Sequence, residues 1–559
     1  MGKRIRVAAA LGVVAALTVG GTSAAHAAVV SPPAAGDCAG GQAPSTAASP
    51  PAGSPTVIVT GTSAGTTAAV TAVECAAGRV DSTFQVIPGV VATVPASHLA
   101  GLKATPGITV TPDVKIDMQS TVESTGPHTP SDVFLQETGA DQLAGSRQHG
   151  RRVNVAVLDT GIAPLPDFAG RLVGGVDLTG GGNPFSDEYG HGTFVAGLIA
   201  GDGASSHGRY SGMDPQAGLV SVKVAGASGQ TDLATVIAGV EWVITHRHSL
   251  GIRVLNMSLG FEPLSSTVDN PLDRVVEQAW RDGIVVVTSA GNAGPFNGTI
   301  LSPGDDPLVI TVGALDDMAT PSPADDEMND FSSVGPTNPD GFVKPDLVTS
   351  GRSVVSLADP GSTVYDQNPS ARIGSANFVG SGTSFSAAIT SGAVGLLLAE
   401  KPYLTPNQVK ALLLGNAMPG PVGNPFVDGH GALNIAAAAA SAPMDYAQST
   451  SGLTATPMGS TVSLAPTGPA DTWNASLWSG TAWNGTAWNG TAWNGTAWNG
   501  TAWNGTAWNG TAWNASLWSG TAWNGTAWNG TAWNGTAWNG TAWNGTAWNA
   551  SLWSGTAWN

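Results

Sequence analysis

The stretch VNVAVLDTGI, residues 153–162, contains a nearly unbroken apolar run that ends at an aspartate and a glycine-containing turn. Runs of this kind are typical of strands buried on both faces of a parallel sheet, because neither face then needs polar residues. Similar runs follow along the chain: LVSVKV (219–224), IRVLNMSL (252–259), GIVVVTSAG (283–291) and PLVITVGAL (307–315).

The segments between these runs have helical periodicity. Behind Asp232, a suitable N-cap, apolar residues recur at i, i+3, i+4 and i+7, which predicts a helix with one face against the sheet. They are Leu233, Val236, Ile237, Val240, Val243 and Ile244. The alternation predicts an α/β fold with a doubly wound, mostly parallel sheet flanked by helices. Functional side chains are expected at the carboxyl ends of its strands, where ligands bind in such folds.

Three segments place a reactive side chain at the end of a predicted strand or the start of a helix. They are VAVLDTGI with Asp159, GHGTFVAG with His191 and GSGTSFSAA with Ser384. A serine hydroxyl becomes an effective nucleophile when a histidine takes its proton, and the resulting imidazolium needs a carboxylate to orient and stabilise it. A fourth segment, SAGNAG, offers the Asn292 amide to a developing oxyanion.

Asp159 alone is weak evidence for catalysis, because the letters DTG also occur in aspartic peptidases and in surface turns. An aspartic peptidase needs two such aspartates, and this motif occurs once in the chain. His246 and His248 are rejected as a metal pair, because residues at i and i+2 of a helix do not face the same way.

The order Asp, His, Asn, Ser and the letters around each residue resemble the subtilisin-like serine peptidases, or subtilases. The resemblance covers roughly Asp132 to Ser441 and includes NMSLG (256–260), KPDLVTSG (344–351) and GHGALN (429–434). It implies a subtilisin-like fold, a triad of Asp159, His191 and Ser384, and Asn292 as the oxyanion donor.

The same resemblance implies a substrate site for an extended peptide, which would add to a strand edge of the enzyme. Ser258, Leu259 and Gly260 would form that edge, and Ser289, Ala290 and Gly291 would line the pocket for the residue before the cut.

The chain departs from the family pattern in several places. Phe194 and Leu165 replace histidines that lie outside the triad, TSG at 349–351 replaces Ala-Pro-Gly, and residues 319–333 form an acidic insertion. No cofactor is expected to be required. Calcium, a structural ion in many subtilases, would suit the acidic residues of the insertion, but a solvated loop is favoured because their spacing is not that of an EF-hand. These residues are Asp325, Asp326, Glu327 and Asp330.

Other segments of the chain are distinguished by composition. A basic start, about 14 apolar residues and Ala-His-Ala at 25–27 are typical of an export signal that is too short to span a bilayer. Residues 55–116 resemble, more weakly, the propeptides of subtilases. The predicted divisions are a signal peptide (1–27), disordered leader (28–55), inhibitory propeptide (56–118), processing linker (119–131), catalytic domain (132–441), second linker (442–472) and tryptophan pentapeptide repeat (473–559).

The repeat contains 18 of the chain's 20 tryptophans, one at every fifth position from Trp473, and no charged residue follows Asp471. Three structures compete: an antiparallel meander with Asn-Gly turns, a solenoid with about four units per coil, and a flexible tail. An ordered β arrangement is favoured, because so many exposed tryptophans would aggregate. Such tryptophan faces suit docking on carbohydrate or cell wall, with a ligand-free spacer as the equal alternative.

The net charge of the chain limits the kinds of molecule that it is expected to bind. Acidic residues outnumber Lys and Arg by 39 to 21, giving a net charge of −18, which disfavours nucleic acid, and no membrane partner is expected. The chain has two cysteines, Cys38 and Cys75, and the sequence favours a disulfide between them and two separate thiols equally.

The predicted protein is a secreted serine endopeptidase for protein or peptide substrates, made as a zymogen that its own propeptide inhibits. A non-catalytic adhesion or carbohydrate-binding protein is the alternative.

Overall fold

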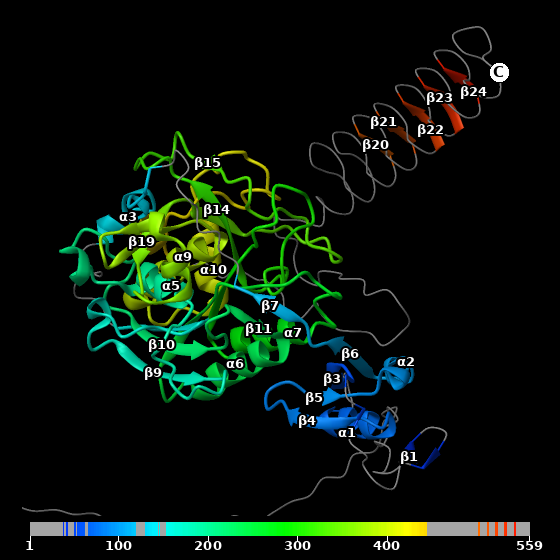
Figure 1. Ribbon diagram of the computed structural model, residues 1–559. Helices are drawn as coiled ribbons and strands as arrows, with labels where there is room; N and C mark the ends of the chain where they lie inside the picture. Colours follow the sequence, from blue (N-terminus) through cyan, green and yellow to red (C-terminus); the bar gives the residue numbers. More distant parts are fainter. Residues whose placement is uncertain are drawn as a thin grey trace, which may run out of the picture.

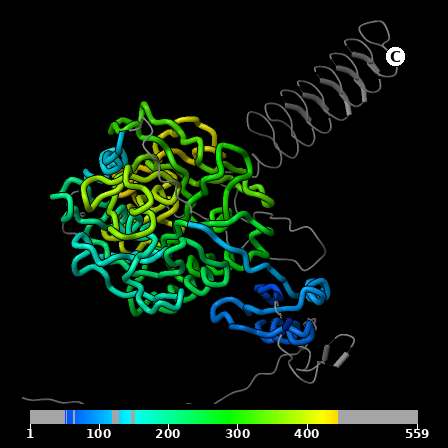
Figure 2. Tube along the Cα trace, in the orientation of Figure 1, coloured from blue at the N-terminus to red at the C-terminus, as the bar shows by residue number. Residues whose placement is uncertain are grey.

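The computed structural model describes residues 53–61, 65–118, 129–143 and 152–443, with short pieces at 37–38, 41–42, 50–51 and 145 and five short strands between 501 and 543. The predicted signal peptide lies outside the described residues, as do most of both linkers, of the leader and of the repeat. The described chain forms a larger lobe and a smaller lobe, which Figure 1 and Figure 2 show beside each other.

The larger lobe is built on an eight-stranded sheet with the order β15-β14-β13-β12-β8-β10-β9, in which β16 also pairs with β14. Neighbouring strands run parallel except β15, which is antiparallel to β14. The predicted apolar runs form the central strands. The bounds are β8 (Asn154–Asp159), β9 (Leu172–Asp177), β10 (Gly218–Lys223), β12 (Ile252–Met257), β13 (Val285–Ser289), β14 (Ile310–Asp316), β15 (Glu327–Met328) and β16 (Leu347–Ser350).

Two layers of helices cover this sheet. The helices α6 (Leu233–His246) and α7 (Pro271–Arg281) pack together, and α5 (His191–Ala200) packs on α9 (Thr383–Glu400). The predicted cap of α6 is confirmed, because the Asp232 side chain accepts a hydrogen bond from the Thr235 amide at 3.0 Å. The doubly wound α/β prediction is therefore correct.

The helix α9 runs through the centre of the larger lobe. In the part of the chain that the structure describes, it is the one helix long and apolar enough to cross a bilayer, but 89% of that stretch is buried inside the lobe. Its apolar character is therefore explained by the core that it forms. The remaining helices and strands of the lobe are α3 (Phe134–Glu137), β11 (Gln230–Asp232), β17 (Val354–Leu357), α8 (Thr363–Gln367), β18 (Arg372–Ile373), β19 (Asn377–Gly380), α10 (Pro406–Gly415) and α11 (Ile435–Ala440).

The smaller lobe is an antiparallel sheet of order β4-β5-β3-β6 with two helices. One face of the sheet has a core of its own, mainly valine and alanine side chains, whereas Ile58, Phe84, Ile87 and Val91 belong to the hydrophobic core of the larger lobe. Cys75 in this lobe is disulfide-bonded, whereas the side chain of Cys38 lies outside the described residues. The bounds are β3 (Thr56–Gly61), α1 (Gly65–Cys75), β4 (Arg79–Thr83), β5 (Gly89–Thr93), α2 (Leu99–Lys103) and β6 (Ile108–Pro112).

One carboxylate of the larger lobe holds the smaller lobe by its backbone. Both oxygens of Glu241 on α6 accept the Gln85 amide, at 2.9 and 3.0 Å, and one oxygen also accepts the amides of Val86 (2.7 Å) and Ile87 (3.2 Å). Glu241 is buried at this junction. Three consecutive N–H groups thus converge on a single negative charge.

A strand beyond the smaller lobe forms a second contact. The strand β7 (Lys115–Asp117) pairs antiparallel with β11, and the Met118 amide donates to the Gly229 carbonyl at 2.9 Å. Ile116 and Met118 are buried in the hydrophobic core of the larger lobe, while Lys115 and Asp117 are exposed. The chain that leaves the smaller lobe is therefore bound as an added strand.

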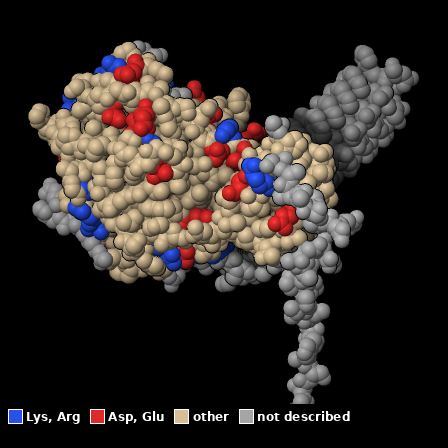
Figure 3. Space-filling model, turned by 60° about the horizontal axis from the view of Figure 1, so that its bottom comes forward, with Lys and Arg blue, Asp and Glu red and all other residues tan. Residues whose placement is uncertain are grey.

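Charged groups are sparse and partly internal. Figure 3 shows Lys, Arg, Asp and Glu in small groups on a mostly uncharged surface. Inside the larger lobe, the ammonium groups of Lys344 and Lys410 contact opposite oxygens of Asp346, at 2.7 and 2.9 Å, and each side chain is 1% exposed. Both ammonium groups also donate to the Val309 carbonyl at 2.9 Å. These buried charges are therefore paired and hydrogen-bonded, as charges in an interior need to be.

The acidic insertion differs from the predicted solvated loop at one residue. Asp325, Glu327 and Asp330 are exposed, but Asp326 is buried and lies near Glu137 of α3. Burial, followed by nearby negative charges, raises the pKa of Asp326 to about 6. The sequence pattern could not show this, because the covering helix lies almost two hundred residues earlier in the chain.

Five described strands of the repeat pair in parallel, β20-β21-β22-β23-β24. They are β20 (Thr501–Trp503), β21 (Thr511–Trp513), β22 (Gly520–Trp523), β23 (Gly530–Trp533) and β24 (Thr541–Trp543). Thr501 pairs with Thr511, so neighbouring strands are ten residues apart. These strands pair in parallel and not as an antiparallel meander, and their step is half that of a coil of four five-residue units.

Candidate active site

The carboxyl end of β8 meets the start of α5 at a buried Asp-His pair. Nδ1 of His191 lies 2.8 Å from Oδ1 and 3.0 Å from Oδ2 of Asp159, and the side chains are 1% and 0% exposed. Burial would lower the pKa of His191, but the negative charge and hydrogen bond of Asp159 and the charge of Asp187 outweigh it, so the pKa is raised. The arrangement stabilises an imidazolium and leaves Nε2 as the nitrogen that can exchange a proton.

Gly190 and Phe194 shape the surroundings of His191. Gly190 precedes α5 with φ 103°, a left-handed conformation that glycine adopts without strain, and a Cβ there would meet Ser362 Oγ at 2.4 Å. Phe194, one turn along α5, packs on Phe385 with ring centroids 4.3 Å apart, and Phe385 lies 5.8 Å from the His191 ring. Phe194, which replaces a histidine of the family pattern, thus forms an aromatic contact between the two helices that carry His191 and Ser384.

Ser384 lies in the first turn of α9 and is fully buried. Its hydroxyl donates to the Ser258 carbonyl at 3.2 Å, and the Ser258 hydroxyl donates to the Ser384 carbonyl at 2.8 Å. Phe385, the next residue, contacts the His191 ring. Ser384 on α9 and His191 on α5 therefore both lie where these two helices are in contact.

Asn292 follows β13 and faces the start of α9. Its Oδ1 accepts hydrogen bonds from both the amide and the hydroxyl of Thr383, each at 2.9 Å. Because an amide N–H can only donate, the atom facing it must be the oxygen of Asn292. Nδ2 is therefore the donor of this side chain.

The residues predicted to bind substrate come from two neighbouring segments. Ser258, Leu259 and Gly260 follow β12, while Ser289 ends β13 and Ala290 and Gly291 follow it. Leu301 lies against both: a Cβ on Gly260 would be 2.9 Å from Leu301 Cβ, and one on Gly291 would be 2.6 Å from Leu301 Cγ. Glycine at these two positions thus lets the segments approach one side chain.

Sequence reasoning missed the second carboxylate near His191. Asp187, four residues before the histidine, is 2% exposed and bonded to Thr160, which follows Asp159. It also missed Thr383 as the residue that orients Asn292, although Thr383 stands directly before Ser384. Among the residues that the structure describes, no group of three His, Cys, Asp or Glu side chains is arranged to hold a metal ion.

The model of the Subtilase family matches residues 150–452, more than half of the chain. The chain belongs to the subtilase family. It is similar to Serine protease AprX of Bacillus subtilis (strain 168), with 43% identity over 295 residues that cover 52% of this chain and 66% of the relative. Subtilisin DY of Bacillus licheniformis is 33% identical over 302 residues, covering 54% of this chain and 95% of the relative.

A solved structure has the same fold. It is the crystal structure of fervidolysin from Fervidobacterium pennivorans, described as a keratinolytic enzyme related to subtilisin, with a TM-score of 0.56 and 23% identity. The match covers 70% of this chain and 61% of fervidolysin. Subtilases are serine endopeptidases, and this subtilase is accordingly of the serine endopeptidase class; the match spans about two thirds of AprX, the first of these relatives.

Proposed function

We propose that this subtilase hydrolyses peptide bonds with Ser384 as nucleophile, His191 as general base and then acid, and Asp159 as the carboxylate that orients His191. The contact of 2.8 Å between Asp159 and His191, beside the start of α9, carries the proposal. A serine hydroxyl is a weak nucleophile until a base accepts its proton, and a histidine held by a carboxylate is suited to that task.

Ser384 Oγ attacks the scissile carbonyl carbon while its proton passes to Nε2 of His191. To do so the hydroxyl turns away from the Ser258 carbonyl, its acceptor at 3.2 Å in the described form. Asn292 Nδ2 donates to the oxyanion that forms. His191 then protonates the leaving amine, and the acyl group remains on Ser384 Oγ. Water attacks this ester with His191 again as base, and the acyl group is released.

Replacing Ser384 with Ala tests this assignment. Casein hydrolysis and labelling by a fluorophosphonate are expected to be lost, because the attacking oxygen is gone. Ser386→Ala is the matched control: this hydroxyl, also on α9, donates to the carbonyls of Thr349 and Ser350 at 3.1 Å. Full hydrolysis by the Ser384 variant would exclude the proposed nucleophile, and loss in both variants would indicate damage to α9.

We further propose that residues 56–118 act as an inhibitory propeptide of the same chain. Support comes from the three amides held by Glu241 and from the pairing of β7 with β11. An extended strand bound this way resembles a substrate added to an enzyme edge. Full-length Ser384→Ala should therefore retain residues 56–118 in mass spectra of the purified protein, whereas the wild type should lose them.

Export and surface retention complete the proposal. The basic and apolar start of the chain supports export, and the uncharged tryptophan repeat supports docking on cell-wall carbohydrate. The alternative, a non-catalytic adhesion protein, predicts an unreactive Ser384. Fluorophosphonate labelling of the wild type separates the two, since a scaffold would not react.

A further inference from the structure

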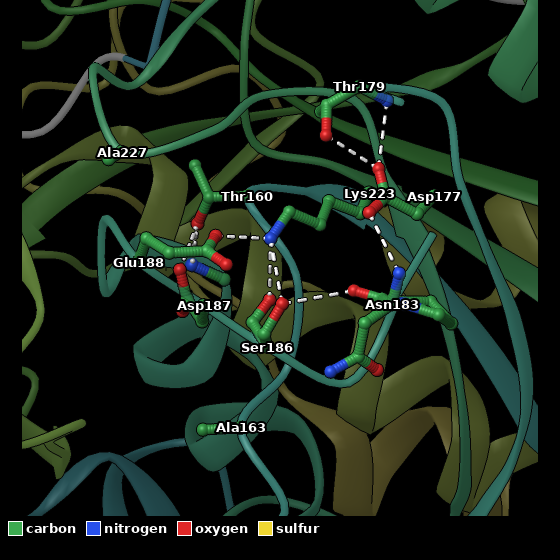
Figure 4. Close-up of polar contacts among 12 residues, drawn as sticks. Thr160, Ala163, Asp177, Thr179, Asn183, Ser186, Asp187, Glu188, Lys223 and Ala227 are labelled. Carbon is green, nitrogen blue, oxygen red and sulfur yellow. Dashed lines mark hydrogen bonds and ion pairs between the residues drawn. The ribbon is translucent and has the colours of Figure 1, made fainter. Parts of the chain in front are cut away.

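Asp187 lies behind the Asp159–His191 pair and is bonded to both of the segments that carry it. Oδ1 of Asp187 accepts the Thr160 hydroxyl and the Gly190 amide, each at 2.7 Å, and Oδ2 accepts the Thr193 amide at 2.7 Å. Thr160 directly follows Asp159, whereas Gly190 precedes α5 and Thr193 lies in its first turn. Figure 4 shows the contact between Asp187 and Thr160.

The hydrogen bonds around Thr160 have one consistent direction. Its hydroxyl oxygen accepts the Gly192 amide at 2.9 Å, so the hydroxyl proton is available to an acceptor. Asp187 at 2.7 Å is a closer acceptor than Asp159 Oδ1 at 3.3 Å. The Thr160 amide in turn donates to Asp159 Oδ1 at 2.8 Å. All three partners of Asp187 are donors, which matches a carboxylate that only accepts.

We propose that Asp187 is a positioning residue for the catalytic histidine: it fixes the first turn of α5 against the residue after Asp159 and places a second negative charge behind the imidazolium. The proposal rests on the proposed triad. Asp187 contacts neither substrate nor the reacting atoms, so its effect passes through His191 and Thr160.

Two consequences follow for His191. Its geometry relative to Asp159 depends on a buried carboxylate that joins the two segments, and small misplacements of catalytic groups cost on the order of 100-fold in rate. The Asp187 charge is also one of the causes that raise the pKa of His191, after burial, which lowers it, and the contributions of Asp159. A purely structural cap would affect folding but not the titration of the imidazole.

Asp187→Asn tests the proposal, because the amide keeps the shape but presents N–H to one of three donors and carries no charge. We expect kcat to fall roughly 10- to 100-fold with little change in KM. The acid limb of the kcat/KM profile should move to lower pH, because loss of the negative charge lowers the pKa of His191. Thr160→Val should lower kcat similarly, and Thr160→Ser, which keeps the hydroxyl, should restore it.

Glu188→Gln is the matched control. It removes the same charge one residue away, where Glu188 pairs with Lys223 and its side chain is half exposed. Its acid limb should coincide with that of the wild type. Only variants that a thermal unfolding curve shows to be folded are compared. The concentration of active sites in each preparation is determined by titration with fluorophosphonate.

The outcomes separate this inference from the triad. If the wild type is labelled at Ser384 but folded Asp187→Asn keeps the wild-type acid limb and kcat, Asp187 is not a positioning residue. A shift that Glu188→Gln reproduces would also contradict it. If the wild type is not labelled at Ser384, the proposed function itself fails. Where Asp187→Asn does not fold, the contrast between Thr160→Val and Thr160→Ser decides the question.

Discussion

At the scale of single residues, the site depends on the balance between burial and charge at His191. The side chain is 1% exposed, an environment that disfavours an imidazolium, yet Asp159 lies within 3.0 Å through both oxygens. The protein thereby favours the charged form of His191, which the proposed mechanism requires when Ser384 gives up its proton. Under the proposed mechanism, the same balance sets the pH range of activity.

The raised pKa of His191 predicts an acid limb of the kcat/KM profile above pH 6.5, the ordinary value for histidine. His191 must be neutral to accept the serine proton, so activity falls as pH decreases through its pKa. Asp159→Asn should lower kcat by on the order of 10⁴. Steady-state kinetics between pH 5 and 9 with a peptide substrate measure both effects; an acid limb below 6.5 in the wild type would contradict the first.

Asn292 is expected to act on kcat. Asn292→Ala should lower kcat by about 10²- to 10³-fold with little change in KM, a magnitude known from the oxyanion donor of subtilisin itself. Thr383→Val, which removes one of the two donors holding Asn292 Oδ1, should give a smaller loss of kcat. Equal kcat for Asn292→Ala and the wild type would remove Asn292 from the proposed mechanism.

At the scale of elements, α6 has one face in the core and carries Glu241 toward the smaller lobe. The apolar face was predictable because it repeats with the helical period. The role of Glu241 was not, because the amides that it binds come from residues 154 to 156 positions earlier in the chain. The same holds for Asp187: its spacing from His191 is visible, but its bond to Thr160 depends on β8 lying beside α5.

Glu241→Gln should weaken the hold of the larger lobe on residues 85–87. Hydrogen bonds to charged groups are worth about 1.5–3 kcal/mol each, so, if residues 56–118 inhibit as proposed, we expect on the order of 10- to 100-fold faster appearance of activity from the full-length chain. Glu277→Gln, a charge loss on the neighbouring helix α7, is the control. Time courses of propeptide release by gel and mass spectrometry measure the rate; identical rates for wild type and Glu241→Gln would show that this contact does not limit release.

At the scale of the whole molecule, the larger lobe carries carboxylates inside its core. Asp305 and Asp306 are 1% and 0% exposed, and both oxygens of Asp305 lack a hydrogen-bond partner among the described residues. Burial raises both pKa values to about 7, helped by the charge of Asp306 for Asp305 and of Glu277 for Asp306. The folded protein therefore holds protons that the unfolded chain releases near pH 3.8.

This difference gives the sign of the pH dependence of stability. The contribution of these carboxyls is fully present below about pH 4 and is lost as pH rises through about 7, because the folded state binds more protons in that window. Asp305→Asn should therefore raise Tm at pH 8, by about 2–6 °C, and change it little at pH 5. Asp330→Asn, at a side chain 84% exposed, is the control. A lower Tm for Asp305→Asn at pH 8 would indicate that the carboxylate has a stabilising partner there.

Deleting residues 473–559 should leave peptide hydrolysis unchanged and reduce retention on cell-wall material. Since no charge follows Asp471, the retention of the full chain should persist in about 1 M salt, where the Debye length is about 3 Å. A pull-down on purified wall at low and high salt measures this. Equal retention of both proteins would remove the anchoring proposal.

The fold and the four proposed catalytic residues were predictable because each depends on a local pattern: apolar runs, a capped helix and short motifs. The ten-residue step of β20 to β24 was not, because the five-residue repeat is compatible with more than one spacing and direction of strand pairing. The burial of Asp326 was missed for a related reason, because a run of acidic residues does not indicate which distant helix will cover one of them.

The enclosed lysines of the larger lobe have a practical consequence for handling the enzyme. Between residues 152 and 443 the chain has four lysines, of which Lys223, Lys344 and Lys410 are 1 to 2% exposed and Lys401 is partly exposed. Amine-reactive linkers should therefore couple the larger lobe to a support mainly through Lys401 and so in one orientation. The rate at which the other three lysines become acylated, followed by mass spectrometry, would measure the rate of unfolding.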